Sequence, residues 1–230
     1  MDRFITSYGD YSIWQLAKSG LYNLARFVVI ENYKHHQMLS DSAMISDSEV
    51  QIVYNEEVQY FEQSRIFVVK NHINEIVGAI RIMNWNKRDE LPITRLFGID
   101  RINNTSFKDD GIDIWHVGRF AVSSGLGRDA LSLFRVLMMF AVAPICKSDN
   151  GVMIAECDSK LFKTVQKLGM NVIALNEGIE YLGSVTIPIY ATRNGLMEFV
   201  ARNCALAVNV EGTINGREQI MISHSERKCA

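Results

Sequence analysis

His116 and Arg119 stand close together in "IDIWHVGRFAV", whose β-branched and aromatic residues predict a strand. His116 is a candidate general base, because it is the one histidine in this predicted central strand and imidazole titrates near neutral pH. In a regular strand, positions 116 and 119 face opposite sides of the sheet. A bulge at Gly118 would turn both side chains to one side. The alternatives are a buried, hydrogen-bonded structural histidine and a glycine that packs under Trp115.

The turn "SSGLG" follows this strand and leads into a predicted helix from Arg128 to about Ile145. The first amides of a helix have no partner inside it, and they lie at the positive end of its dipole. We therefore predict that the backbone N–H groups of Gly125, Leu126, Gly127 and Arg128 form a cradle for a phosphate. The alternative is a tight turn with no ligand, since glycine is common between a strand and a helix.

Arg81 lies within "AIRIM", where apolar neighbours on both sides predict a strand position inside the fold. A buried guanidinium group needs an anionic partner. We expect Arg81 either to bridge to Glu156 or Asp113, or to hold a carboxylate of a substrate. Arg119 presents the same two alternatives.

The predicted elements that must position these residues follow one another as helix, hairpin, strand, helix, strand, helix and two further strands. The stretch "VQIVYNEEV" fits either a helix or a strand, and its sequence does not decide between the two. Asp158 is a predicted N-cap, and Gly169 is predicted to follow the end of the same helix. The predicted segments are helix from Ile13 to about Met38, the strand pair "SRIFVVK" and "EIVGAIRIMNW" around the turn Asn71 to Glu75, strand "IDIWHVGRFAV", helix Arg128 to Ile145, strand "GVMIAE", helix Asp158 to Leu168, strands "NVIAL" and "GSVTIPIYA", and an amphipathic "GLMEFVARNCALAV".

The composition is typical of a globular protein with its own core. The 230 residues are 48% hydrophobic and 22% charged, with a net charge of −2 and a pI near 6.2. That balance provides no positive field for a polyanion, so we expect no nucleic-acid partner. The length suits one domain, residues 1–193, followed by a C-terminal extension, residues 194–230, whose polar end we expect to be loosely held.

Cysteine, histidine and apolar patterns argue against several other classes. The four cysteines form no C-x-x-C pair, which predicts reduced thiols in a cytoplasmic protein. The apolar run "LSLFRVLMMFAVAPI" contains Arg135 and ends near Pro144, so we expect a buried helix and no membrane span. His35 and His36 are adjacent with no third ligand at helical spacing, so we expect no metal site.

Three segments together resemble the GNAT fold of N-acyltransferases, and within it the acyl-homoserine-lactone synthases and long-chain N-acyl amino acid synthases. These are "VGAIRIMNWNKRDELP", "IWHVGRFAV" and "LFKTVQKLGMNVIAL". The resemblance implies an α/β (α+β) fold, with a GNAT-like mixed central sheet, a splayed central strand and flanking helices. The sequence departs from the family at His116, where the synthases have glutamate, and at Val122, where the loop consensus [RQ]-x-x-G-x-[GA] begins with a polar residue. The family's acidic pair has no clear match in "SDSAMISDSEV".

The resemblance also implies a reaction. An acyl group, expected to be a fatty acyl group, would pass directly from an acyl carrier protein or CoA thioester to the amine of a small acceptor such as an amino acid, with no tightly bound cofactor. It places His116, Arg119 and Gly118 at the catalytic site, Val122 with the glycine loop at the donor phosphate, and Arg81, Trp115 and Phe120 at the substrate. A carrier-protein donor predicts a basic docking patch, for which the candidates are Arg128, Arg135 and Lys147. The alternatives are a short-chain CoA-dependent N-acetyltransferase and an inactive GNAT-like binding module.

Overall fold

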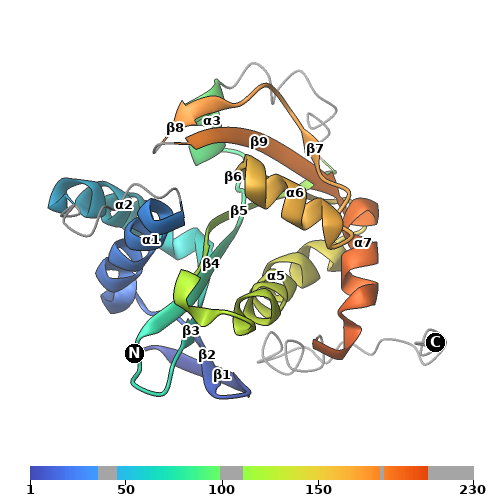
Figure 1. The fold of residues 1–230 in the computed structure, drawn as a ribbon. Coiled ribbons are helices and arrows are strands. Elements are labelled where there is room, and N and C mark those ends of the chain that lie inside the picture. The colour runs from blue at the N-terminus through green and yellow to red at the C-terminus, as the bar shows by residue number, and fades with distance from the viewer. Residues whose placement is uncertain (36–45, 99–110, 182–183, 207–230) are drawn as a thin grey trace.

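The computed structural model describes residues 1–35, 46–98, 111–181 and 184–206 (Figure 1). The predicted order of hairpin, strand, helix, strand and helix is present from β3 to α6, and the short helix α3 lies within it. The strands are β1 (Arg3–Tyr8), β2 (Tyr11–Gln15), β3 (Ser64–Lys70), β4 (Ile76–Asn84), β5 (Asp113–Val122), β6 (Gly151–Asp158), β7 (Ile173–Ala174), β8 (Ile179–Tyr181) and β9 (Ser184–Thr192). The α-helices are α1 (Leu21–His35), α2 (Asp47–Tyr60), α3 (Pro92–Phe97), α5 (Asp129–Lys147), α6 (Ser159–Lys167) and α7 (Arg193–Arg202).

The strands of the described residues form one mixed sheet in the order β1-β2-β3-β4-β5-β6-β9-β7, and β8 pairs with β9. Neighbouring strands are antiparallel except for β5 and β6, which run parallel. The β5–β6 pairing extends from Asp113 and Gly151 as far as Val117 and Ala155. Beyond that point β5 continues to pair with β4, and β6 with β9. The central strands therefore splay apart, and the predicted fold class is confirmed.

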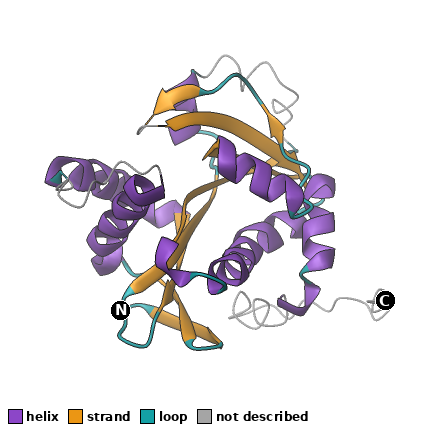
Figure 2. Cartoon of the chain, in the orientation of Figure 1, coloured by secondary structure: helices purple, strands orange, loops and turns teal. Residues whose placement is uncertain are grey.

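Helices cover both faces of the sheet, with α1, α2 and α3 on one face and α5, α6 and α7 on the other (Figures 1 and 2). The alternation of side chains along β4 explains the two layers. Ile80 and Ile82 belong to the core that contains α5, whereas Ala79 packs in the cluster of α1. Arg81 points to the same side as Ala79, so it faces α2 from within the sheet.

The β3–β4 hairpin, the α6 cap and the end of α6 agree with the sequence predictions. Asn71 shapes the hairpin turn, because its Oδ1 accepts hydrogen bonds from the amides of Ile73 and Glu75. Asp158 caps α6 by accepting from the amides of Lys160 and Leu161, and Gly169 has a φ of +93° directly after that helix.

Two predictions in the first third of the chain need correction or completion. Residues 13–15 belong to strand β2 rather than to a helix, because they pair with β3, and α1 starts only at Leu21. Ile13 is a buried residue of β2, and the apolar residues that follow it belong to other elements. Together they imitate the spacing of a helix. The open stretch "VQIVYNEEV" lies in α2, which begins after Ser46, whose Oγ accepts from the amide of Ser48.

In the C-terminal half, one predicted strand is shorter than expected and a helix lies where an amphipathic segment was predicted. Only Ile173 and Ala174 of "NVIAL" form a strand. The predicted segment "GLMEFVARNCALAV" contains most of α7, which begins at Arg193. Leu196 and Phe199 of α7 are fully buried in the core with α5.

Among the described residues, α5 is the helix long and apolar enough to cross a membrane, yet most of its apolar side chains are buried in the fold.

Candidate active site

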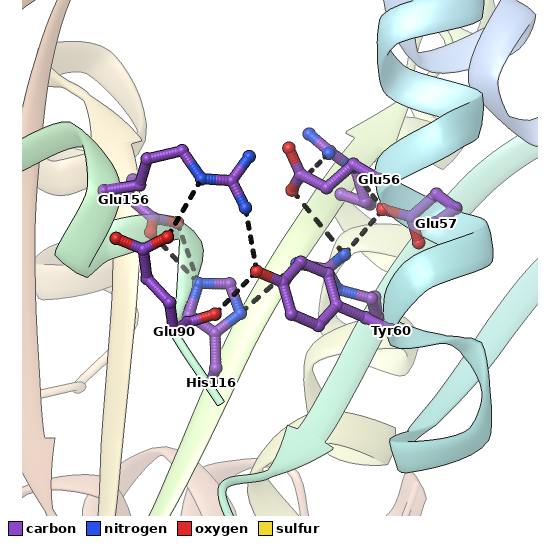
Figure 3. A network of polar contacts seen from close by, with 9 residues as sticks. Glu56, Glu57, Tyr60, Glu90, His116 and Glu156 are labelled. Atoms are coloured by element: carbon purple, nitrogen blue, oxygen red, sulfur yellow. Dashed lines mark hydrogen bonds and ion pairs between the residues drawn. The ribbon is translucent and has the colours of Figure 1, made fainter. Parts of the chain in front are cut away.

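His116 and Glu156 meet at the point where β5 and β6 stop pairing (Figure 3). His116 Nε2 lies 3.0 Å from Glu156 Oε2 and 3.1 Å from Oε1, and His116 Nδ1 lies 3.4 Å from Arg81 Nη2. A guanidinium group can only donate, so Nδ1 accepts and Nε2 carries the proton that it donates to the carboxylate. The His116 side chain is 1% exposed and that of Glu156 is 12% exposed. The carboxylate is therefore the end of the pair that a substrate can reach.

A bulge in β5 brings Arg119 to the same side as His116. Arg81 pairs with Gly118 and Ala79 pairs with Ala121, so β5 contains one residue more than β4 between these two pairs. Arg119 lies in this bulge with a φ of +52°, a conformation that L-residues rarely adopt. The bulge was predicted from the position of Gly118, and it begins directly after that residue.

Arg119 joins two adjacent glutamates of α2. Its Nε donates to Glu57 Oε1 over 2.7 Å, and its Nη2 lies 2.7 Å from Glu56 Oε1. The planar guanidinium group can make both contacts at once, which a lysine could not do in the same geometry. These contacts hold the Arg119 side chain against α2, from which Glu56 and Glu57 project (Figure 3).

Arg81 shares the Glu57 carboxylate with Arg119. Its Nη1 donates to Glu57 Oε1 over 2.6 Å, its guanidinium carbon lies 5.4 Å from the centre of the Tyr60 ring, and its side chain is 1% exposed. Neither predicted structural partner contacts Arg81 directly, so that prediction is wrong. Asp113 accepts from Ser148 at the other end of β5, and Glu156 is reached only through His116.

The carboxylates of the network are kept ionised by their neighbours. Burial by itself would raise the pKa of Glu57, but the charges of Arg81 and Arg119 outweigh it and hold the pKa below its ordinary value. Burial likewise opposes ionisation of Glu156, and His116 together with the two arginines holds its pKa below the ordinary value. The site thus offers a negatively charged Glu156 beside the splay.

Tyr60 extends the network to α3. Its hydroxyl donates to the Glu90 carbonyl over 2.6 Å and accepts from Arg95 Nη2 over 3.0 Å. Burial raises the pKa of Tyr60, so the hydroxyl stays protonated near neutral pH. This arrangement fixes the aromatic ring on which Arg81 stacks (Figure 3).

Gly118 provides the space in which His116 and Arg81 approach each other. A Cβ at position 118 would lie 3.1 Å from His116 Cε1 and 3.2 Å from Arg81 Nη2. The neighbours that require a glycine are therefore these two side chains rather than Trp115.

The predicted phosphate cradle is an exposed turn between β5 and α5. Residues Ser124–Leu126 form a 3₁₀ turn, and Gly127 follows with a φ of +54°. Within the described part of the chain, the amides of Gly125, Gly127 and Arg128 make no backbone hydrogen bond outside a helix, whereas that of Leu126 has a long contact with the Ser123 carbonyl. Val122 ends β5, and its side chain packs with the core on the α5 side.

Several predicted residues lie away from the charged network. Trp115 and Phe120 pack with the core around α5, and the Phe120 ring contacts Phe134 edge to face, with ring centres 4.5 Å apart.

Lys147 lies at the end of α5 opposite to Arg128, roughly 27 Å along a helix axis that rises 1.5 Å per residue. Arg128 and Lys147 therefore cannot belong to one compact basic patch.

The residues that the sequence analysis did not identify are Glu56, Glu57 and Tyr60. A signal was present, because Val50, Val53, Glu57 and Tyr60 recur at helical spacing, and all four are buried. A glutamate on such an apolar face requires a cationic partner inside the fold.

The fold is shared with several solved structures, although no family model and no curated protein matches the sequence. FeeM, an N-acyl amino acid synthase from uncultured soil microbes, is 14% identical with a TM-score of 0.55, over 84% of this chain and 93% of its own. The AHL synthase LasI is 13% identical with a TM-score of 0.53, over 82% and 93%. A GNAT-family acetyltransferase from Staphylococcus aureus Mu50 is 12% identical with a TM-score of 0.50, over 79% and 98%. The expected GNAT fold is thereby confirmed.

Proposed function

We propose that this chain is an N-acyltransferase that moves an acyl group, expected to be a fatty acyl group, from a thioester to the amine of a small acceptor. The observation that carries the proposal is the ionised Glu156, held by His116 at the splay between β5 and β6. The similarity in fold to an N-acyl amino acid synthase and an AHL synthase supports the same reaction class.

The proposed step is direct attack of the amine on the thioester carbonyl. The carbon–nitrogen bond forms and the carbon–sulfur bond breaks. One proton passes from the amine to Glu156 and from Glu156 to the departing thiolate, which restores the ionised carboxylate. His116 holds the carboxylate in place by donating Nε2–H to it, and this hydrogen bond together with the charges of Arg81 and Arg119 favours the ionised form. His116 therefore supports the proton transfer by positioning Glu156.

A covalent acyl-enzyme on the nearest cysteine does not fit the site. Cys157 follows Glu156 on β6, and burial together with the neighbouring carboxylates raises its pKa to about 12. Its thiol stays protonated and is a poor nucleophile at neutral pH. This supports direct transfer.

The donor is proposed to be an acyl carrier protein or CoA thioester, whose pantetheine arm ends in a phosphate. The exposed amides of Gly125, Gly127 and Arg128 are the groups proposed to bind that phosphate at the start of α5. The edge of β5 beyond Val117 is proposed to receive the arm, because its pairing with β6 ends there.

The test is product formation from a panel of acyl carrier protein and CoA thioesters of different chain length with a panel of small amines, read by mass spectrometry. We expect an amide product with the wild-type protein and a strong reduction with Glu156→Gln. The matched control is Glu198→Gln, since Glu198 forms an exposed ion pair with Arg202 on α7. Absence of product with every thioester would refute the proposal and favour a binding module.

A further inference from the structure

Glu31, in the last turn of α1, is a buried carboxylate that the proposed reaction does not use. Its residue is 6% exposed, and its Oε2 accepts a hydrogen bond from the amide of Ser124 over 2.9 Å. Its Oε1 lies 2.9 Å from Lys34 Nζ and 3.5 Å from Ser123 Oγ. One buried side chain thus connects α1 with the first residues of the turn between β5 and α5.

This contact replaces a cap that the turn itself does not provide. Ser123 precedes the 3₁₀ turn Ser124–Leu126, and its side chain makes no capping hydrogen bond to it. Glu31 instead satisfies the first amide of the turn from outside. Among the described residues, the amides of Gly125, Gly127 and Arg128 make no backbone hydrogen bond outside a helix, and they are the amides that the proposed function assigns to the phosphate.

The charge of Glu31 is balanced locally, so it need not repel an anion. The ammonium group of Lys34 pairs with one carboxylate oxygen, and the Ser124 amide occupies the other. A charge-assisted hydrogen bond to a backbone amide is stronger than a neutral one and fixes the geometry of the donor. Glu31 can therefore fix the orientation of the turn while Lys34 compensates its charge.

The remaining contacts of α1 do not depend on Glu31. Leu24 and Phe27 pack against β3 and β4 residues, and Ala25 and Val29 pack against α2. The hydroxyl of Tyr33 donates to Glu49 of α2. Removal of Glu31 would leave these layers in place and release mainly the turn.

We infer that Glu31 is a positioning residue, which holds the turn 123–128 in the shape that binds the phosphate of the acyl donor. The inference rests on the proposed function, because it takes the turn as the donor phosphate site. It predicts that loss of Glu31 weakens donor binding without removing the proton-transfer pair His116 and Glu156.

The experiment measures binding of 4′-phosphopantetheine, the part shared by both donor classes, by isothermal titration calorimetry. Glu31→Ala should raise the Kd about tenfold, which corresponds to loss of one charge-assisted hydrogen bond. Glu31→Gln keeps an acceptor oxygen and should restore part of the affinity. In steady-state assays with the thioester, the KM for the donor should rise while kcat is largely retained.

The matched control is Glu49→Ala, which removes the contact of Glu49 with Tyr33 between α1 and α2 and keeps the contact of Glu31 with Ser124. It should bind 4′-phosphopantetheine like the wild type, and circular dichroism checks that each variant is folded. Unchanged Kd values in Glu31→Gln and Glu31→Ala would overturn the inference and leave the proposed function intact. If the wild type binds neither 4′-phosphopantetheine nor any acyl thioester, the proposed donor site is wrong. The inference that Glu31 positions that site is then wrong as well.

Discussion

Glu156 Oε2 accepts a hydrogen bond from His116 Nε2 over 3.0 Å, across the point where the two parallel strands of the sheet separate. His116 is enclosed, with Arg81 on its other nitrogen, whereas Glu156 keeps an accessible edge. Two residues therefore contribute to the function of the general base. The imidazole orients the carboxylate, and the carboxylate faces the substrate.

Replacing Glu156 with glutamine should lower kcat/KM for acyl transfer by about 10² to 10⁴-fold, because an amide cannot take the proton of the amine. The size of the amide is similar to that of the carboxylate, so the contact with His116 can be kept through its oxygen. The measurement is the initial rate with a saturating donor and varied acceptor. A rate equal to that of wild type would exclude Glu156 from the proton transfer.

Replacing Glu57 with glutamine should lower the free energy of unfolding by about 3–5 kcal/mol, the cost typical of removing one partner of a buried ion pair. Arg81 would lose its close anion in the interior, whereas Arg119 would keep its contact with Glu56. Urea denaturation measures the change. Glu62→Gln is the control, since Glu62 is exposed and follows the same helix, and it should leave stability nearly unchanged.

The stability of the wild type should also depend on acid pH through Glu57. The pKa of this carboxyl lies below its ordinary value of 4.5 in the folded protein. The stabilisation is therefore fully present above the pKa of the unfolded chain, and it is lost as the pH falls through the folded pKa. Unfolding free energies measured between neutral pH and about pH 3 should decrease for wild type and decrease less for Glu57→Gln. Equal slopes would show that Glu57 does not titrate differently in the two states.

Local patterns made much of the fold predictable. The β3–β4 hairpin combines two runs of β-branched residues with a polar turn, and Asn71 satisfies the turn amides through its own side chain. The limits of α6 are likewise set by neighbouring residues, through the Asp158 cap and the positive φ of Gly169. Each of these features depends on residues only a few positions apart.

The charged network was less predictable, because its partners are far apart in the sequence. Glu57 meets Arg81 and Arg119 only after β4 and β5 have paired and α2 has packed across them. The helical spacing of Val50, Val53, Glu57 and Tyr60 can place Glu57 on a buried face, but it does not identify the partners of Glu57. The position of Arg119 could be anticipated from the bulge, but its partner could not.

Gly118→Ala should destabilise the protein by about 1–3 kcal/mol and reduce activity, since the added methyl group crowds the site. The methyl carbon would come within 3.1 Å of His116 Cε1 and 3.2 Å of Arg81 Nη2. Gly78→Ala is the control, because its Cβ would meet the flexible end of Leu137, away from the charged network. Thermal melts and acyl-transfer rates separate the two effects. A loss of activity in Gly78→Ala as large as that in Gly118→Ala would contradict a specific role for the space at Gly118.

Gly127→Ala should destabilise the turn by about 1–3 kcal/mol, because alanine is strained in the backbone conformation that Gly127 adopts. Gly127 has a φ of +54° and a ψ of −118°, and an added Cβ there would contact nothing within 4 Å. Any effect must therefore come from the backbone rather than from a clash. Gly125→Ala tests this reading, since Gly125 has no positive φ and its Cβ would meet only Ser123 Oγ at 3.9 Å. Urea denaturation should show a loss in Gly127→Ala and little change in Gly125→Ala, and the KM for the thioester donor should rise in Gly127→Ala. Equal stability of the two variants would show that the turn does not depend on the left-handed conformation at Gly127.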